Sequence, residues 1–507
     1  MKNRSFFKSS GFYLGVALAI GSILRIYHLG YESLWADEAF SVFIAKKSFI
    51  ELITLCVKID VHPPLYVALL KCWIFLFGIS ELALRSFSAI FGILTIYIIY
   101  RLGSLLYDRM VGVIASYVSA CSAFLIRYSQ EARSYALLAF LSTLSIYLFC
   151  KFLKKADRKN YFYLLIVNVL LSYTHIFGLM VIVAEFIFFF VLFKKTKRNF
   201  KQYLSLTISN VLMFIPWLLA LLSQASRVKK TGFWIPYVDF HSMLMNIMRF
   251  YSGGWNLFAF GVCVPLLFIG IPKFKKALNG GNAGKYAWMP WKGIKLESFD
   301  QGILLFVWLL VPLILCSMLS ILVLPVYGAR NLIVGAPAFY ILLSAGIRNI
   351  SGLKLKPTVA ILVFILSFVL FFGEDAIGNL NQYNKENWRD LTQFIMEKEK
   401  PADVILVYPY FADIPFEYYY KGKSKRIIVD TKQELQNQNW DLGAANKLDK
   451  VKRIWVVYRL LNPSQEPYMR SLYDYLTRKL GYAMVYERYY TKDRQVWLFL
   501  YERNPKT

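Results

Sequence analysis

Charged residues are scarce in this sequence, and acidic residues are scarcer still. Only 18% of the 507 residues are charged, 31 are Asp or Glu, and 57% are hydrophobic, with a mean hydropathy of +0.45. Soluble domains carry about 25% charged residues, so these values exclude a water-soluble globule, a disordered chain and a coiled coil. The six cysteines form no CxxC pair and lie in apolar segments, which excludes a disulfide scaffold and favours a role as small hydrophobic residues.

The basic excess is concentrated in the apolar part of the chain. The formal net charge is +28, and residues 384–507 hold 22 Lys or Arg and 16 Asp or Glu, so the first 383 residues carry +22 of it. In a hydrophobic chain, Lys and Arg mark the cytoplasmic loops of a membrane protein and contact lipid headgroups. We therefore expect membrane lipids as partners and no nucleic acid.

Eleven apolar runs have roughly the length of membrane-spanning helices, which need about 20 residues each. They lie near residues 11–28, 83–100, 111–127, 135–152, 160–174, 176–193, 203–222, 255–272, 302–321, 331–349 and 357–372. If the N-terminus is cytoplasmic, the basic loops at 151–159, 194–201, 273–295 and 348–356 also face the cytoplasm, as the positive-inside rule requires. The sequence thus predicts a polytopic α-helical protein of the cell (plasma or inner) membrane, with residues 1–375 as its transmembrane domain.

One long outer loop, at about residues 29–82, separates the first two spans. Within it, Pro63–Gly78 is apolar but short and carries Lys71 in its middle. A crossing there would move every later basic loop to the other side of the membrane. We expect this segment to lie in the interface or re-enter, like the amphipathic segment at 40–58.

The composition changes to that of a soluble domain over residues 376–507. Helical spacing at 388–397 and 468–480 alternates with strand-like runs at 404–410, 426–430, 453–459, 482–490 and 495–503. These runs predict a small α/β domain, which eleven crossings place outside the cytoplasm. The domain has no GxGxxG motif, Walker loop or zinc-ligand spacing, so the sequence does not indicate its role.

The first outer loop holds two adjacent carboxylates. Leu34–Phe40 (LWADEAF) places Asp37 beside Glu38 just after the first span. A partly desolvated carboxylate at a membrane surface can act as a general base. The same residue types are also suited to capping the first turn of a following helix. Spacing alone leaves both interpretations open.

Two histidine motifs follow. Val61–Tyr66 (VHPPLY) opens a helix with two prolines, and His62 there can bind phosphate or a metal, or can belong to a structural turn. Tyr173–Gly178 (YTHIFG) places His175 at the end of a short helix, where packing is favoured over ligation.

Two arginine motifs are expected on the same outer face. Tyr128–Tyr135 (YSQEARSY) carries Glu131 and Arg133, which would not face each other on a helix and therefore need partners elsewhere, such as a lipid phosphate. Snorkelling of the arginine to headgroups is the alternative. In the segment YGARN at 327–331, Arg330 can bind phosphate. Carboxylates and cations beside a bilayer suit a phosphate-bearing lipid substrate and an acid–base reaction at its head.

The ordered set of motifs resembles a family. LWADEAF, HPPLY, Gly78–Glu81 with Arg85, YSQEARSYAL, YTHIFG and NWRDL at 387–391 together resemble the membrane glycosyltransferases of family 39. These include the protein O-mannosyltransferases and the aminoarabinose transferases of lipid A. The resemblance implies the C-type glycosyltransferase fold, a catalytic first outer loop and a polyprenyl-phosphate sugar as donor. It also implies inversion by direct attack, without a covalent enzyme intermediate.

The resemblance also implies roles for single residues. Asp37 is the implied general base towards an acceptor hydroxyl, and Glu38 shapes its surroundings or contacts substrate. Arg133 and Arg330 would bind the lipid phosphate. The same donor site would include His62, which stands where the aminoarabinose enzymes carry a Lys, together with Glu131 of the arginine motif. Asn331 stands where relatives often show Tyr.

The sequence leaves the sugar and the acceptor open. A glycan, a lipid or a protein hydroxyl would each suit the reaction. No cofactor is implied and no metal ligands are assigned, because HxxH and paired-histidine spacings are absent. Weak divalent-metal binding in the loop stays open. The alternatives are a transporter or flippase of lipid-linked sugars, for which no inverted repeat is seen, and a membrane-anchored glycan-binding assembly protein.

Overall fold

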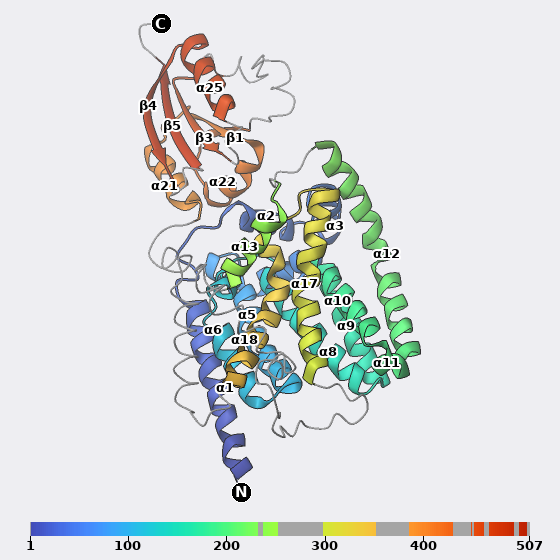
Figure 1. The fold of residues 1–507 in the computed structure, drawn as a ribbon. Coiled ribbons are helices and arrows are strands. Elements are labelled where there is room, and N and C mark those ends of the chain that lie inside the picture. Colours follow the sequence, from blue (N-terminus) through green and yellow to red (C-terminus); the bar gives the residue numbers. More distant parts are fainter. Residues whose placement is uncertain are drawn as a thin grey trace. The chain divides into compact units, whose positions relative to one another are not determined.

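The computed structural model divides into two compact units (Figure 1). It describes residues 2–231, 237–251, 298–350, 385–428, 448, 451–460, 466–490 and 496–503. The first unit, called the helical unit here, comprises Met1–Leu29 and Lys47–Ile377. The second, called the α/β unit, comprises Gly30–Lys46 and Gly378–Thr507. Residues 30–46 of the first predicted outer loop therefore belong with the C-terminal part of the chain.

The helical unit is built from apolar helices. They are α1 (Lys2–Ile26), α3 (Phe49–Lys58), α4 (Leu65–Phe77), α5 (Glu81–Leu106), α6 (Arg109–Ala120), α7 (Ala123–Ser129), α8 (Tyr135–Lys154), α9 (Arg158–Thr174), α10 (Phe177–Val191), α11 (Phe193–Thr196), α12 (Phe200–Thr231), α13 (Phe240–Tyr251), α17 (Ser298–Leu322) and α18 (Ala336–Ile350), with 3-10 turns at Lys197–Asn199 (η1) and Ala329–Gly335 (η3). Polar N-caps begin several of them: the side chains of Ser80, Asp108 and Asp157 accept from the backbone N–H three residues on.

The long apolar helices agree with a membrane-spanning unit. Among the described residues, five helical segments are long and apolar enough to cross a bilayer, and a bent pair adds a sixth candidate. They include α5, α8 and α17. Two predicted spans, near 255–272 and 357–372, lie outside the described residues, so the count of eleven stays a prediction.

One predicted span is broken. The apolar run at 111–127 forms α6 and α7, which meet at an angle of 61°. The break has local causes: Cys121 ends α6, and the Ser122 side chain caps α7 by accepting from Leu125 N. The buried guanidinium of Arg25 on α1 donates to carbonyls at the C-terminal end of α6, Ser119 O at 3.1 Å and Ala120 O at 3.0 Å.

The outer-loop segments of the helical unit are short helices. The 13 residues of α4 span about 20 Å at 1.5 Å per residue, less than the roughly 30 Å hydrocarbon core. Segment 40–58, expected as one amphipathic stretch, instead forms α2 (Ala36–Ala45) and α3, which belong to different units. Ser48 starts α3 anew, since its side chain accepts from Glu51 N.

The α/β unit contains a five-stranded sheet in the order β2-β1-β3-β5-β4. The strands are β1 (Val404–Tyr408), β2 (Lys425–Ile428), β3 (Arg453–Arg459), β4 (Tyr482–Tyr489) and β5 (Val496–Arg503), with α21 (Trp388–Lys398), α22 (Asp413–Tyr419) and α25 (Glu466–Asp474). The strand β1 pairs in parallel with β2 and β3, and β5 runs antiparallel to β3 and β4. Each sheet face carries its own core, around Tyr458 and Trp455 respectively. The predicted small α/β fold is confirmed.

Candidate functional site

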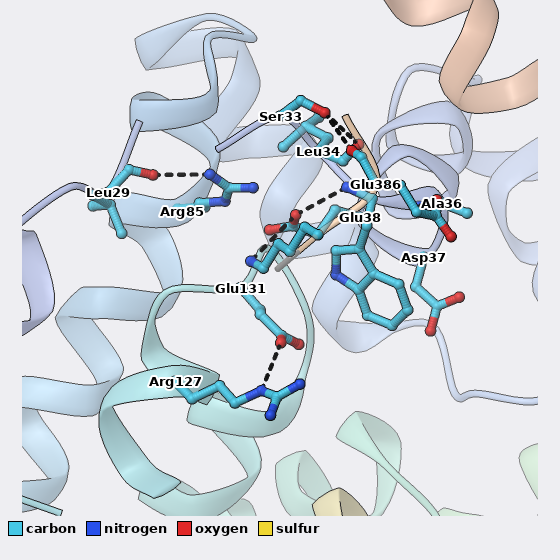
Figure 2. Close-up of polar contacts among 12 residues, drawn as sticks. Leu29, Ser33, Leu34, Ala36, Asp37, Glu38, Arg85, Arg127, Glu131 and Glu386 are labelled. Carbon is cyan, nitrogen blue, oxygen red and sulfur yellow. Dashed lines mark hydrogen bonds and ion pairs between the residues drawn. The ribbon is translucent and has the colours of Figure 1, made fainter. Parts of the chain in front are cut away.

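Asp37 and Glu38 occupy the first turn of α2, where the helix dipole stabilises carboxylates. Glu38 is fully buried, and its Oε2 accepts from Trp35 N at 3.3 Å and lies 3.6 Å from Lys385 Nζ. Asp37 is only partly buried, and Figure 2 shows its carboxylate directed away from Glu38. The capping alternative therefore describes Glu38, whereas the Asp37 side chain is presented for other contacts.

His62 begins the short turn that leads into α4. Asp60 Oδ1 accepts from Val61 N at 2.7 Å and from His62 N at 3.3 Å, which fixes this turn. The His62 ring lies 4.7 Å from the ring of His175, centroid to centroid. Two of the four histidines in the chain thus meet in the helical unit, although 113 positions separate their numbers.

His175 sits between α9 and α10 and is almost fully buried. Its Nδ1 accepts from Phe177 N at 3.2 Å, so in the neutral ring the proton is on Nε2. Within the described part of the chain, this buried Nε2 has no hydrogen-bond partner. Burial holds the pKa of His175 well below its ordinary 6.5, and repulsion from His62, Arg133 and Arg330 lowers it further.

Arg133 and Arg330 approach the same place from different elements. Arg133 is buried, and its carbonyl accepts from Ser88 Oγ at 3.2 Å, which holds the segment before α8 against α5. The Arg330 guanidinium lies over the ring of Tyr135, 5.6 Å from its centroid, and that ring is 6.0 Å from His175. We call His62, Arg133, His175 and Arg330 the cationic cluster.

Glu131 takes a different partner. Its Oε1 lies 3.8 Å from Arg127 Nε, an ion pair within one helical turn that Figure 2 shows. Of the six site residues expected from sequence, three therefore come together in the cationic cluster. Glu131 lies near it in sequence, while Asp37 and Glu38 belong to the α/β unit. No group of three potential metal ligands occurs among the residues that the structure describes.

Two features of the site were not expected from sequence. His175 was interpreted as packing, and only the scarcity of histidine could have directed attention to it. Glu386 and Arg459 were not considered. They form a buried ion pair, with Arg459 Nη2 at 2.6 Å from Glu386 Oε1, across 73 positions of sequence. A local sequence pattern cannot predict an ion pair between residues so far apart.

Comparisons with known proteins show what the sequence and the fold are similar to. Residues 61–220 match the dolichyl-phosphate-mannose-protein mannosyltransferase family. The fold is similar to ArnT from Cupriavidus metallidurans in the apo state, with a TM-score of 0.63 at 12% identity over 97% of this chain and 98% of that one. It is also similar to ArnT bound to undecaprenyl phosphate, with a TM-score of 0.58 at 13% identity over 96% and 97% of the two chains.

A third solved structure has a similar fold, with a lower TM-score. The oligosaccharyltransferase AglB from Archaeoglobus fulgidus, in complex with an inhibitory peptide and a dolichol-phosphate, gives a TM-score of 0.55 at 12% identity, covering 98% of this chain and 74% of that one. No curated protein matches the sequence significantly. The family match over residues 61–220 and the likeness of fold confirm the resemblance that the motifs indicated, and the likeness to ArnT shows that this chain has the same fold.

Proposed function

We propose that the chain transfers a sugar from a polyprenyl-phosphate-linked donor to an acceptor hydroxyl at the outer face of the cell membrane, with inversion at the anomeric carbon. The observation that carries this proposal is the cationic cluster. Two arginines and His62 converge there on the buried imidazole N–H of His175, which has no hydrogen-bond partner among the described residues. The solved ArnT complex with undecaprenyl phosphate supports a lipid phosphate as the ligand.

The reaction assigns a role to each charge. Asp37 takes the proton from the acceptor hydroxyl as its oxygen attacks the anomeric carbon. The bond from that carbon to the phosphate oxygen breaks, and a phosphodiester with one negative charge becomes a phosphate monoester with up to two. Arg133 and Arg330 stabilise this added charge, and the Nε2–H of His175 donates a hydrogen bond to the phosphate. Glu38 holds the helix that carries Asp37. Glu131, paired with Arg127, and His62 line the donor side.

The test uses the full chain in lipid vesicles with a labelled polyprenyl-phosphate sugar. Asp37→Asn is expected to lower transfer by about 10²- to 10⁴-fold, the usual contribution of a general base, with donor binding unchanged. Arg133→Ala is expected to weaken donor binding by about 10- to 100-fold, as the loss of one charged hydrogen bond predicts. Glu51→Gln, at an exposed capping carboxylate on α3, is the matched control.

Two outcomes would contradict the proposal. Full transfer by Asp37→Asn would remove the assignment of the base. Transport of labelled donor across the vesicle membrane without release of polyprenyl phosphate would indicate a flippase. Inversion is checked separately, since the product must carry the opposite anomeric configuration to the donor.

A further inference from the structure

The C-terminal residues of the α/β unit hold the start of α2 through one buried carboxylate. Glu386 Oε2 accepts from the backbone N–H of Ala36 at 3.0 Å, which is the first residue of α2, and from Trp388 Nε1 at 2.7 Å. Oε1 accepts from Arg459 Nε at 2.7 Å. Glu386, Trp388 and Arg459 are all buried. Each carboxylate oxygen therefore has a specific donor, and the orientation of the group is fully determined.

The backbone just before α2 is held by the same segment. Ser33 Oγ donates to Glu386 O at 2.7 Å and accepts from Trp388 N at 3.1 Å, so it bridges two residues of the C-terminal segment. Figure 2 shows Ser33, Ala36 and Glu386 gathered at this point. Since the Ser33 side chain is completely buried, water does not compete for these hydrogen bonds.

Further contacts from the same unit surround this anchor. Leu34 N donates to Tyr419 Oη at 2.7 Å, and Arg389 Nη1 donates to Tyr31 O at 3.1 Å. The Lys385–Glu38 ion pair adds a contact on the first turn of α2 itself. These contacts come from residues that the sequence interpretation left without a role, including the NWRDL motif.

We propose that Glu386 is a positioning residue for the transfer reaction: oriented by Arg459, it fixes the first turn of α2 and with it the direction of the Asp37 carboxylate. This role of Glu386 rests on the proposed function at one point, the assignment of Asp37 as the general base. A base must be held within about 0.5 Å and 10–20° of its productive geometry. Ala36, whose N–H donates to the Glu386 carboxylate, is the immediate neighbour of Asp37, so a shift of this turn moves the base directly. The α/β unit thereby acquires a role in catalysis without contacting substrate.

Glu386→Gln tests the proposal with little change in volume. A glutamine offers one acceptor oxygen and one NH₂ group, so either Arg459 or the Ala36 and Trp388 N–H groups must face a donor instead of an acceptor. We expect the first turn of α2 to loosen and kcat to fall by about 10- to 100-fold, the effect of roughly 1 Å of misplacement. The KM for the lipid donor should stay unchanged.

Glu399→Gln is the matched control. Glu399 lies in the same unit and is also saturated with hydrogen bonds, accepting from Tyr420 Oη at 2.6 Å, Ser424 Oγ at 2.5 Å and Lys423 N at 3.0 Å. These contacts hold the turn before β2, and none of them goes to residues 30–46. Glu399→Gln is therefore expected to keep the wild-type kcat, which separates positioning of the base from general destabilisation of the unit.

Hydrogen exchange reports the position of α2 independently of catalysis. Amides at residues 34–40 should exchange faster in Glu386→Gln, and at wild-type rates in Glu399→Gln and Asp37→Asn. If Glu386→Gln does not accumulate, Ser33→Ala probes the same anchor more gently and should show a smaller change in the same direction. Wild-type kcat with wild-type exchange in either variant would overturn the proposal. An active Asp37→Asn would instead refute the assignment of the base, while faster exchange in Glu386→Gln would still establish the anchor.

Discussion

A ring of three buried side chains in the helical unit makes a prediction about protonation. Ser145 on α8, Asn168 on α9 and Glu185 on α10 are all buried. Ser145 Oγ lies 2.5 Å from Asn168 Oδ1 and 2.6 Å from Glu185 Oε1, and Asn168 Nδ2 lies 3.1 Å from Glu185 Oε2. Three contacts therefore close a ring that joins three helices.

Each contact in the ring needs one hydrogen. Ser145 supplies one from its hydroxyl, and Asn168 supplies one because its amide nitrogen takes part in only one of its two contacts. Rotating the amide by 180° changes which contact it serves but not the number. The third hydrogen must come from Glu185, so the carboxyl group is neutral in this ring. A neutral acid also avoids the large free-energy cost of burying an unpaired charge in a bilayer.

This count predicts that Glu185→Gln is tolerated and Glu185→Ala is not. A glutamine supplies one hydrogen and one acceptor, like a neutral glutamic acid, so all three contacts persist and the free energy of unfolding should be nearly unchanged. Alanine removes two contacts, each worth about 0.6 and at most about 1.7 kcal/mol between membrane helices. We expect a loss of about 1–3 kcal/mol, before any contribution from the cavity.

Unfolding in micelles with increasing SDS measures these differences. Ser145→Ala should lose about 1 kcal/mol or more for its two contacts. Ser142→Ala is the control, because this equally buried hydroxyl on α8 donates only to Leu138 O of its own helix. Infrared spectra should show a carboxylic-acid C=O band that disappears in Glu185→Gln. Equal destabilisation by glutamine and alanine, with no such band, would refute the proton count and indicate an ionised carboxylate.

Two further predictions concern packing and pH. A Cβ at Gly92 would overlap the Ser129 side chain, so Gly92→Ala should lower the free energy of unfolding by about 1–3 kcal/mol. Gly15→Ala is the control and should leave the free energy of unfolding unchanged, because a Cβ there meets nothing within 4 Å. Equal effects of the two substitutions would refute the close approach of α5 and α7. Because the pKa of His175 is well below 6.5, the unfolded chain binds a proton that the folded chain does not, and stability should fall as pH drops below about 6.5, by up to about 1.4 kcal/mol per pH unit. His175→Gln should flatten this dependence, and an unchanged slope would show that another group titrates.

The elements that depend on local pattern were predicted well. The apolar run expected at 135–152 is α8, Tyr135–Lys154, and the strand expected at 453–459 is β3 with the same bounds. Hydrophobic period and run length are properties of neighbouring residues, so they can be read from the chain. The break between α6 and α7 was not predicted. Its Ser122 cap is local, but the guanidinium that donates to the carbonyls of Ser119 and Ala120 belongs to Arg25, some 95 positions away.

That α2 belongs to the α/β unit also could not be predicted from local sequence patterns. The contacts that hold α2 join Ser33 and Ala36 to Glu386, across about 350 positions of sequence. Contacts between residues so far apart produce no periodic pattern in the sequence. The sequence did indicate that the charges matter, because acidic residues are rare in an apolar chain. It could not say which carboxylates hold structure and which remain for chemistry.

Helix geometry gives Asp37 and Glu38 different orientations. Adjacent residues on a helix point about 100° apart, so only one of the two carboxylates can turn toward the backbone of Trp35 and the ammonium of Lys385. Glu38 is that residue, and its burial leaves it no surface for substrate. Asp37 must then point elsewhere, and its side chain is partly exposed. Of the two interpretations that spacing alone left open, capping therefore describes Glu38, and acid–base chemistry stays a prediction for Asp37.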